Sequence, residues 1–212
     1  MAGQPKTKNR TPKYNQRRRE VLQAAARIFN RRGYHLATLD DVAEELGVTK
    51  PALYYYARSK EELLFACGQM ALEDLSKALD ESRGKELTGL ERLAQFFRLY
   101  AEIVCGDFGR CLVLTEPRDL SPKSRRENVS GRRTINHAIQ KIIRDGIEDG
   151  SIRACDDRSL SIAMFDAFNG IARWHNPRGA LSLPDVVEQY LAIFEKGIAT
   201  GETRAPGRKP SS

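Results

Sequence analysis

The chain contains 212 residues, of which 41% are apolar and 30% charged, and its net charge is +7. This size allows one medium core, or a small domain joined to a larger one. No apolar run is long enough to cross a bilayer and the N-terminus is polar and basic, so we expect a soluble, cytoplasmic protein without a membrane partner.

The positive charge is concentrated in the first 60 residues. This segment has 13 Lys and Arg against 5 Asp and Glu, a net of +8, whereas the remaining 152 residues have 22 against 23, a net of −1. A basic module attached to a nearly neutral body is typical of a protein that binds nucleic acid through one domain.

The cysteines and histidines give no sign of a metal site or a catalytic centre. The cysteines lack C-x-x-C spacing, and no histidine has a metal-spaced or triad-like set of residues around it. We therefore expect no metal, no cofactor and no enzymatic activity. The residues concerned are Cys67, Cys105, Cys111 and Cys155, together with His35, His137 and His175.

Residues 1–15 carry basic side chains among polar ones, with almost no apolar anchor, and are expected to form a disordered arm. The arm either serves solubility alone or lies along DNA, as basic arms do beside helix-turn-helix domains. A first helix is predicted over 16–32. Arg17 and Arg18 stand at its N-terminal end, where cations oppose the helix dipole, so phosphate contact explains them better than helix stability does.

Residues 38–63 predict two short helices and a tight turn, followed by the start of a longer helix. Thr38 and Asp41 have the spacing of a side-chain cap for the first helix, and Ser59 and Glu62 have the spacing of a full capping box for the third.

The turn between the two short helices is equally well marked. Gly47 suits the left-handed residue that ends a helix, Thr49 can cap the next one, and Pro51 fits its first turn. Leu53 and Ala57 are expected to face inward. A helix, a glycine-containing turn and a second helix are typical of a helix-turn-helix DNA reader.

Over residues 19–66 the chain resembles the DNA-binding domain of the tetracycline-repressor (TetR) family. One departure is Tyr56-Ala57, because family members usually carry an aromatic residue at the position of Ala57; Tyr56 is then either a core residue or a DNA contact. The matching features are Ala25 and Phe29 before Gly33-Tyr34, Thr38, Val42-Ala43, Gly47-Val48-Thr49-Lys50, Leu53-Tyr54-Tyr55 and the SKEELL run at 59–64.

The resemblance implies contacts with a double-stranded DNA operator. It places Thr38, Tyr55 and Lys60 at the phosphate backbone, and it places Thr49, Lys50, Pro51, Ala52 and Tyr54 at the major groove. Lys50 is the expected direct reader, because its amine can donate to the O6 and N7 acceptors of guanine. Two such readers about one DNA turn apart imply a roughly palindromic operator.

The remaining chain predicts further helices and no strands. Helices are expected from 59 to about 82, and others are expected to begin near Thr88, Ser121, Asp156 and Pro184, with a break at 105–107. The charged first half of the helix after Ser121 is expected to be a solvated face. The fold class is therefore all-α with about nine helices: a helix-turn-helix domain at 16–62, a ligand-binding and dimerisation domain at 63–200, and a disordered tail at 201–212.

The last two helices carry apolar residues over a wider face than one packing partner requires, with small residues interspersed. They are either fully buried in the monomer or form a four-helix interface with the same helices of a second copy. The resemblance favours the homodimer.

The resemblance also implies a small-molecule pocket in the C-terminal domain. Arg173-Trp174-His175-Asn176-Pro177-Arg178-Gly179 is similar to a segment of family members that respond to acyl-coenzyme A thioesters, which suggests an apolar organic acid or its thioester as the ligand. Each aromatic candidate is otherwise ordinary core. The candidate pocket residues are Phe96, Phe97, Tyr100, Val104, Phe108, His137, Phe165, Phe168, Asn169, Arg173 and Trp174.

Together these features predict a ligand-responsive transcriptional regulator, a repressor released from its operator when the ligand binds. A thiol-redox trigger is an alternative, because Cys105 and Cys111 flank a glycine-containing helix break. A ligand-independent DNA-binding protein is another, although it would not need so large a neutral C-terminal region.

Overall fold

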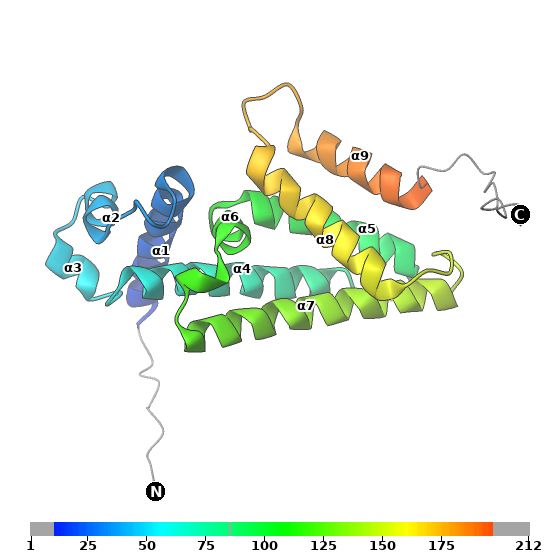
Figure 1. The fold of residues 1–212 in the computed structure, drawn as a ribbon, viewed down its shortest axis with the longest axis horizontal. Helices are drawn as coiled ribbons and strands as arrows, with labels where there is room; N and C mark the ends of the chain where they lie inside the picture. Colours follow the sequence, from blue (N-terminus) through cyan, green and yellow to red (C-terminus); the bar gives the residue numbers. More distant parts are fainter. Residues whose placement is uncertain (1–10, 85, 197–212) are drawn as a thin grey trace, which may run out of the picture.

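The structure, a computed structural model, describes residues 11–84 and 86–196, and the regular elements within these ranges are all helices (Figure 1). The expected all-α class with about nine helices is confirmed. None of the described helices is both long and apolar enough to span a bilayer. The elements are α1 (Pro12–Arg32), α2 (Leu39–Glu45), α3 (Lys50–Tyr54), α4 (Lys60–Glu81), α5 (Gly89–Cys105), α6 (Asp107–Leu114), a 3-10 turn η1 (Pro117–Asp119), α7 (Pro122–Glu148), α8 (Asp157–Trp174) and α9 (Leu183–Lys196).

The first helix begins earlier than expected. Thr11 caps α1 by accepting a hydrogen bond from the Tyr14 backbone N–H at 3.4 Å, and Pro12 occupies the first helical position. Residues 12–15 are therefore helical and not part of an arm, because a Thr cap followed by Pro favours a helix start despite the polar composition. Residues 1–10 and the expected tail at 201–212 lie outside the described residues.

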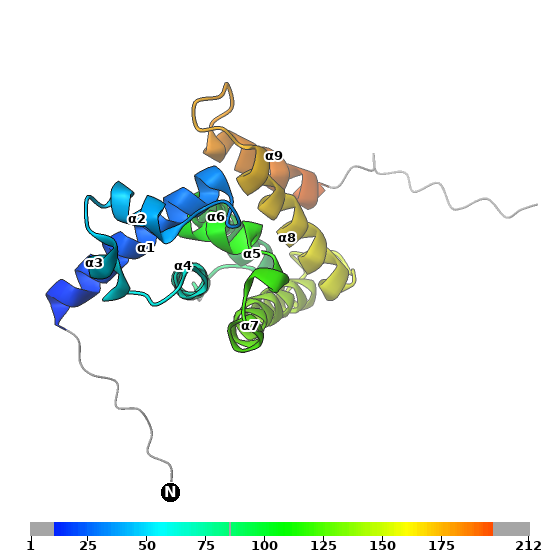
Figure 2. The same cartoon turned by 60° about the vertical axis from the view of Figure 1, so that its left-hand side comes forward.

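Helix α4 runs from the group formed by α1, α2 and α3 into the larger helical body (Figures 1 and 2). Its first half, up to Cys67, packs in a cluster with α1, α2 and α3, and this cluster also includes Cys111 of α6 and Leu120. From Ala71 onward, α4 belongs to a second and larger cluster with α5, α7, α8 and α9. A shift of α4 therefore changes the packing of both cores at once.

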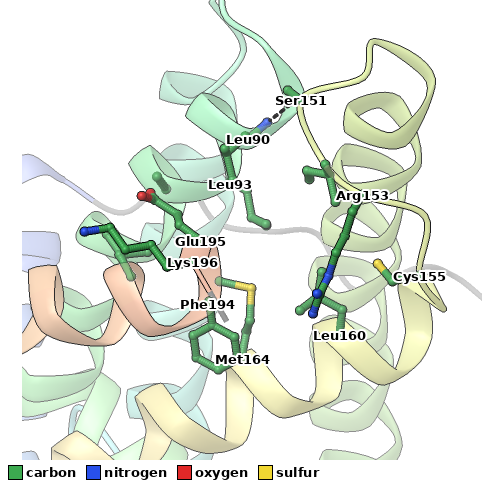
Figure 3. Close-up of a pocket in the computed structure, with 13 residues that line it drawn as sticks. Leu90, Leu93, Ser151, Arg153, Cys155, Leu160, Met164, Phe194, Glu195 and Lys196 are labelled. Carbon is green, nitrogen blue, oxygen red and sulfur yellow. Dashed lines mark hydrogen bonds between the residues drawn. The ribbon is translucent and has the colours of Figure 1, made fainter. Parts of the chain in front are cut away.

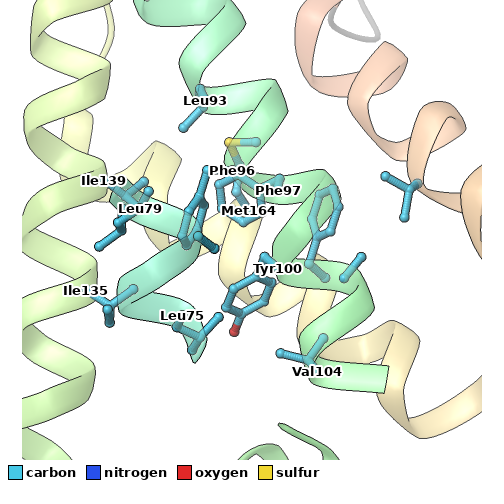
Figure 4. Packing of buried hydrophobic residues seen from close by; sticks show 14 of the residues in the cluster. Leu75, Leu79, Leu93, Phe96, Phe97, Tyr100, Val104, Ile135, Ile139 and Met164 are labelled. Atoms are coloured by element: carbon cyan, nitrogen blue, oxygen red, sulfur yellow. The ribbon is translucent and has the colours of Figure 1, made fainter. Parts of the chain in front are cut away.

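The larger core is aromatic at its centre. Phe96, Phe97 and Phe168 have no exposed surface, and the Phe97 and Phe168 ring centroids are 4.7 Å apart. Figure 4 shows Phe96 and Tyr100 of α5 between the side chains of α4 and α7 and Met164 of α8. Each fully buried ring of this kind contributes about 1.5–3 kcal/mol to folding through the hydrophobic effect.

Helix α6 approaches α5 so closely that a side chain does not fit between them. A Cβ atom at Gly109 would lie 1.9 Å from the Ile103 carbonyl oxygen. The break expected at 105–107 is present, since α5 ends at Cys105 and α6 begins at Asp107. Glycine at position 109 thus lets α6 turn back onto α5 while it also contacts α1 and α4.

Candidate DNA interface and ligand cavity

The helix-turn-helix is built from local signals that the sequence displays. Thr38 Oγ1 accepts from the Asp41 N–H at 3.1 Å, and Asp41 accepts from the Thr38 N–H at 2.8 Å, which completes a capping box for α2. Gly47 has φ +61°, the left-handed conformation that glycine adopts most readily. Leu53 and Ala57 are 1% and 3% exposed, as expected for inward-facing residues.

Helix α3 presents one exposed face. Lys50, Pro51 and Ala52 are exposed, as are Tyr54 and Tyr55, the latter by 70%. Thr49 is the N-cap residue of α3, but its side chain makes no capping hydrogen bond. The residues expected at the major groove are therefore brought together on one surface.

The ammonium of Lys50 is paired in the free protein. Its Nζ lies 2.8 Å from Oδ2 of Asp40, and this hydrogen bond raises the pKa of Lys50. The sequence did not indicate this contact with Asp40, which occupies one of the three hydrogens of the ammonium.

Three tyrosines join the start of α1 to the end of α3. The Tyr14 ring stacks on Tyr56 with centroids 5.4 Å apart, and it meets the edge of Tyr55 at 5.6 Å. Tyr56 is half-buried in this cluster, so of the two roles open to it the structure favours packing. Arg17 lies nearby, ion-paired with Glu20 at 2.6 Å.

Arg18 is half-buried, as Arg17 is. It lies close enough to Cys67 of α4 to oppose the effect of burial on the pKa of that thiol. The two arginines therefore differ in their neighbours: Arg17 lies beside the tyrosine cluster, whereas Arg18 lies near Cys67 of α4.

In the protein without DNA, Lys60 contacts backbone carbonyls, and its expected phosphate contact stays a prediction. Its Nζ donates to the carbonyl oxygens of Tyr34, His35 and Ala37 at 2.8, 3.2 and 2.9 Å, and it lies 4.5 Å from the centroid of the Tyr34 ring. The physical reason is that the turn after α1 leaves these carbonyls without backbone donors, and an ammonium has three hydrogen atoms to offer. Lys60 thus holds the α1–α2 turn against α4.

The capping box expected at the start of α4 is incomplete. Ser59 Oγ accepts from the Glu62 N–H at 3.0 Å, as predicted, but the Glu62 carboxylate accepts from the Arg58 N–H at 2.8 Å and not from that of Ser59.

A cavity of about 200 Å³ lies inside the C-terminal helices, and we call it the chamber. Its wall is mostly apolar, with one arginine and one aspartate among its polar groups. Tyr100 donates from its hydroxyl to Asn169 Oδ1 at 2.6 Å, and burial raises the pKa of Tyr100. The lining residues are Leu72 and Leu75 of α4, Tyr100 of α5, Leu112 and Val113 of α6, Arg132, Ile135 and Asn136 of α7, and Ile162, Phe165, Asp166 and Asn169 of α8.

Of the candidate pocket residues, Tyr100, Phe165 and Asn169 line the chamber. The others lie elsewhere, because helical periodicity identifies a buried face but not which part of that face borders a cavity. Four of them are fully buried in the core: Phe96, Phe97, Val104 and Phe168. Phe108 packs near α1, with the Arg19 guanidinium 5.9 Å from its ring centroid. Arg173 and Trp174 are exposed at the end of α8, and His137 lies on α7 outside the chamber.

Arg132 was missed, because the charged first half of α7 was expected to be a solvated face. Part of the side chain is exposed, but its guanidinium turns inward, donating to the Leu112 carbonyl and to Asn128 Oδ1, the latter at 2.9 Å. Loss of hydration around the group lowers the pKa of Arg132. The available signal was its spacing of three residues before the buried Ile135, which puts it on the inner face.

A second cavity of about 340 Å³ lies at the far end of α5, α8 and α9 (Figure 3). Met164 and Phe194 form part of its wall, and Arg153, Cys155 and Lys196 supply polar groups. It is larger than the chamber, but it contains none of the predicted pocket residues and no residue of α4. A molecule bound there would not touch the helix that joins the two cores.

The cysteine that contacts Cys111 is not Cys105, with which a redox trigger was considered, but Cys67. Cys111 contacts Cys67 of α4, and both are buried where α1, α4 and α6 meet. Burial raises the pKa of Cys67 well above its ordinary value and raises that of Cys105 as well. Because the thiolate is the reactive form, these environments disfavour a thiol-redox trigger.

The outer faces of α8 and α9 expose apolar residues. Ile162, Trp174 and Ile193 are 45%, 50% and 52% exposed, and a Cβ atom at Gly170 would meet nothing within 4 Å. Full burial of both helices in the monomer is therefore wrong.

The exposed α3 face and the larger helical body define a helix-turn-helix DNA-binding protein with a second, helical domain. Residues 21–67 match the model for bacterial regulatory proteins of the tetR family, and residues 86–198 match the tetracyclin repressor-like C-terminal domain. The chain therefore belongs to the tetR family, and it is a DNA-binding transcriptional regulator, not an enzyme.

Relatives and solved structures agree with this assignment over most of the chain. The transcriptional repressor KstR2 of Mycolicibacterium smegmatis is 28% identical over 189 residues, covering 88% of this chain and 92% of the relative. The fatty acid metabolism regulator protein of Bacillus subtilis is 24% identical, covering 74% and 79%. The crystal structure of the tetR-family regulator PfmR of Thermus thermophilus superposes with a TM-score of 0.76 at 28% identity, covering 84% and 98%.

Proposed function

We propose that this protein is a homodimeric repressor that leaves its operator when a small, largely apolar acyl compound occupies the chamber. The observation that carries the proposal is the position of the chamber. Leu72 and Leu75 of α4 form part of its wall, and α4 begins with Lys60, which holds the α1–α2 turn. A ligand that binds one position of α4 better than another would shift the helix-turn-helix.

The DNA contacts in this proposal come from the exposed face of α3 and its surroundings. Lys50, Pro51, Ala52 and Tyr54 face the major groove, and Tyr55 contacts a phosphate. Arg17, Arg18, Thr38 and Thr49 lie around this face. The two α3 helices of a dimer read the halves of a palindromic operator.

The dimer forms through the outer faces of α8 and α9. The exposed Trp174 and Ile193 support this, because such residues gain stabilisation when a second copy covers them. The fatty acid metabolism regulator among the relatives supports an acyl compound as the ligand, and the transcriptional repressor KstR2 supports repression as the sign of regulation.

Gly170 gives a test of the dimer. Gly170→Arg fits the free surface of a monomer but would bury an unpaired charge in the proposed interface, so we expect the dimer dissociation constant to rise by about two orders of magnitude or more. Light scattering after size exclusion measures the change, and circular dichroism should show unchanged helicity. Gly170→Ala is the matched control and should remain dimeric; a dimeric Gly170→Arg protein would exclude this interface.

The proposed response is tested with purified protein and a fragment of its own upstream region. Organic acids and acyl thioesters are first screened for a rise in melting temperature, because a ligand that binds only the folded state stabilises it. Fluorescence anisotropy of labelled DNA then measures release. We expect at least one stabilising compound to weaken DNA binding; stabilising compounds that leave DNA binding unchanged would contradict the proposal.

A further inference from the structure

The ring of Tyr55 is held by contacts outside its own helix. Tyr55 directly follows the last residue of α3, and its side chain is 70% exposed. A ring so exposed has few packing neighbours to fix its orientation. Among the described residues, its ring contacts are with Tyr14 at the start of α1 and with the adjacent Tyr56.

The three rings have a defined geometry. Tyr14 and Tyr56 lie nearly parallel, with 27° between their planes and 5.4 Å between their centroids. Tyr55 meets both of them at close to a right angle, with interplanar angles of 77° and 88° and centroid distances of 5.6 and 5.0 Å. Edge-to-face contacts are a favoured arrangement of aromatic pairs, so the two half-buried rings hold the exposed one in a single orientation.

Tyr14 has a fixed position because it belongs to a capped helix. Its backbone N–H donates to Thr11 Oγ1 at 3.4 Å, and the N–H of Asn15 donates to the Thr11 carbonyl oxygen at 3.1 Å. The end of α3 therefore rests on the first turn of α1, and Figures 1 and 2 both show the two elements side by side. This part of the expected arm is a support for α3.

A surface hollow of about 650 Å³ lies beside the tyrosine cluster, and Tyr55 forms part of its wall. The cations Lys13 and Arg17 also line it. In the described part of the chain its one carboxylate is Glu20, which is paired with Arg17 at 2.6 Å. A phosphate strand suits this surface, because a tyrosine hydroxyl can donate to a phosphate oxygen while the cations offset the negative charge.

We infer that Tyr14 is a positioning residue for DNA binding: it holds the Tyr55 ring so that the Tyr55 hydroxyl donates to a phosphate of an operator strand lying along the hollow. The inference rests on the proposed function, which places Tyr55 at a phosphate. A ring that is fixed before DNA arrives loses less conformational entropy on binding. Removal of Tyr14 therefore weakens the complex through Tyr55.

A double-mutant cycle tests this role, with the full chain and a labelled fragment of its own upstream region. By fluorescence anisotropy we expect Tyr55→Phe, which removes only the hydroxyl, to weaken binding at least about tenfold. Tyr14→Leu removes the supporting ring and should weaken binding about three- to tenfold. In the Tyr55→Phe background, Tyr14→Leu should cause less than about a twofold further loss, because no hydroxyl is left to position.

Tyr14→Phe is the matched control, since it keeps the ring, and it should bind within about twofold of the native protein. A loss as large as that of Tyr14→Leu would mean that the Tyr14 hydroxyl itself contacts DNA. The salt dependence of binding should be the same in all of these variants, because a tyrosine neutralises no phosphate. A weaker salt dependence with Tyr14→Leu would mean that Tyr14 positions Lys13 or Arg17 instead. Either result would overturn the inference.

Circular dichroism and the melting temperature show whether each variant folds. If Tyr14→Leu does not fold, Tyr14→Met takes its place in the same cycle, with the same dependence on the background. Equal losses in the native and Tyr55→Phe backgrounds would overturn the positioning role and leave the phosphate contact of Tyr55 intact. Native affinity of the Tyr55→Phe protein would instead overturn that contact, which belongs to the proposed function, and the inference with it.

Discussion

Replacing Lys60 with methionine is expected to destabilise the protein by about 2 kcal/mol and to weaken operator binding without changing its salt dependence. Methionine keeps the apolar stem but leaves the carbonyls of Tyr34, His35 and Ala37 without their shared donor. The α1–α2 turn then becomes more mobile, and Thr38 and α2 are held less firmly in the orientation that binds DNA. Urea unfolding measures the stability, and anisotropy titrations at several salt concentrations measure the slope.

Two other substitutions serve as references for the stability and the salt slope of the Lys60→Met protein. Lys77→Met removes a lysine from the exposed part of the same helix, where it pairs with Asp74, and should leave stability nearly unchanged. Arg17→Ala should reduce the salt slope of the proposed dimer by about 1.8, because each of its two subunits then neutralises one phosphate fewer. If Lys60→Met lowers the slope as Arg17→Ala does, then Lys60 reaches a phosphate in the complex, and the bracing role is wrong.

Replacing Gly109 with alanine is expected to have an effect of similar or greater size, about 3 kcal/mol or more, because the new methyl group would collide with backbone and not with a movable side chain. The Ile103 carbonyl oxygen would be 1.9 Å away, so α5 and α6 have to separate. Since α6 also packs on α1 and α4, the change should disturb both cores and lower the ligand response as well as the melting temperature.

Gly106→Ala is the matched control for this prediction. It alters the same helix junction, but its Cβ atom would lie 3.3 Å from the Ile103 carbonyl oxygen, a tight contact that a small shift relieves. We expect it to melt close to the native protein. Equal melting temperatures for Gly109→Ala and the native protein would mean that α6 can move away from α5 at little cost.

The helix-turn-helix could be predicted from the sequence because its determinants are local. The Thr38–Asp41 capping box, Gly47 at positive φ, and the burial of Leu53 and Ala57 involve residues close together in the chain. Tertiary packing then has little freedom to change them, since each local preference agrees with the next.

The contacts of long side chains could not be predicted in the same way. Lys60 and Arg132 both carry flexible stems, and each bonds to a carbonyl oxygen at least 20 residues away in sequence. The composition of the surrounding segment suggested solvent or DNA, whereas the nearest unsatisfied acceptors belong to other elements. The residues that line the chamber were equally hard to predict. Phe97 and Phe165 both recur at helical spacing among apolar residues, and only the arrangement of five helices decides that Phe165 borders the cavity while Phe97 lies in the core.

The Asp40–Lys50 ion pair affects how this regulator behaves on random genomic sequence. In the proposed complex, the right guanine accepts from a Lys50 ammonium that also donates to Asp40, whereas on other sequence the ammonium keeps only the Asp40 carboxylate. Mismatched sites thus lack one charge-assisted hydrogen bond. The protein should therefore depart from foreign DNA quickly and spend more of its search time sampling new positions.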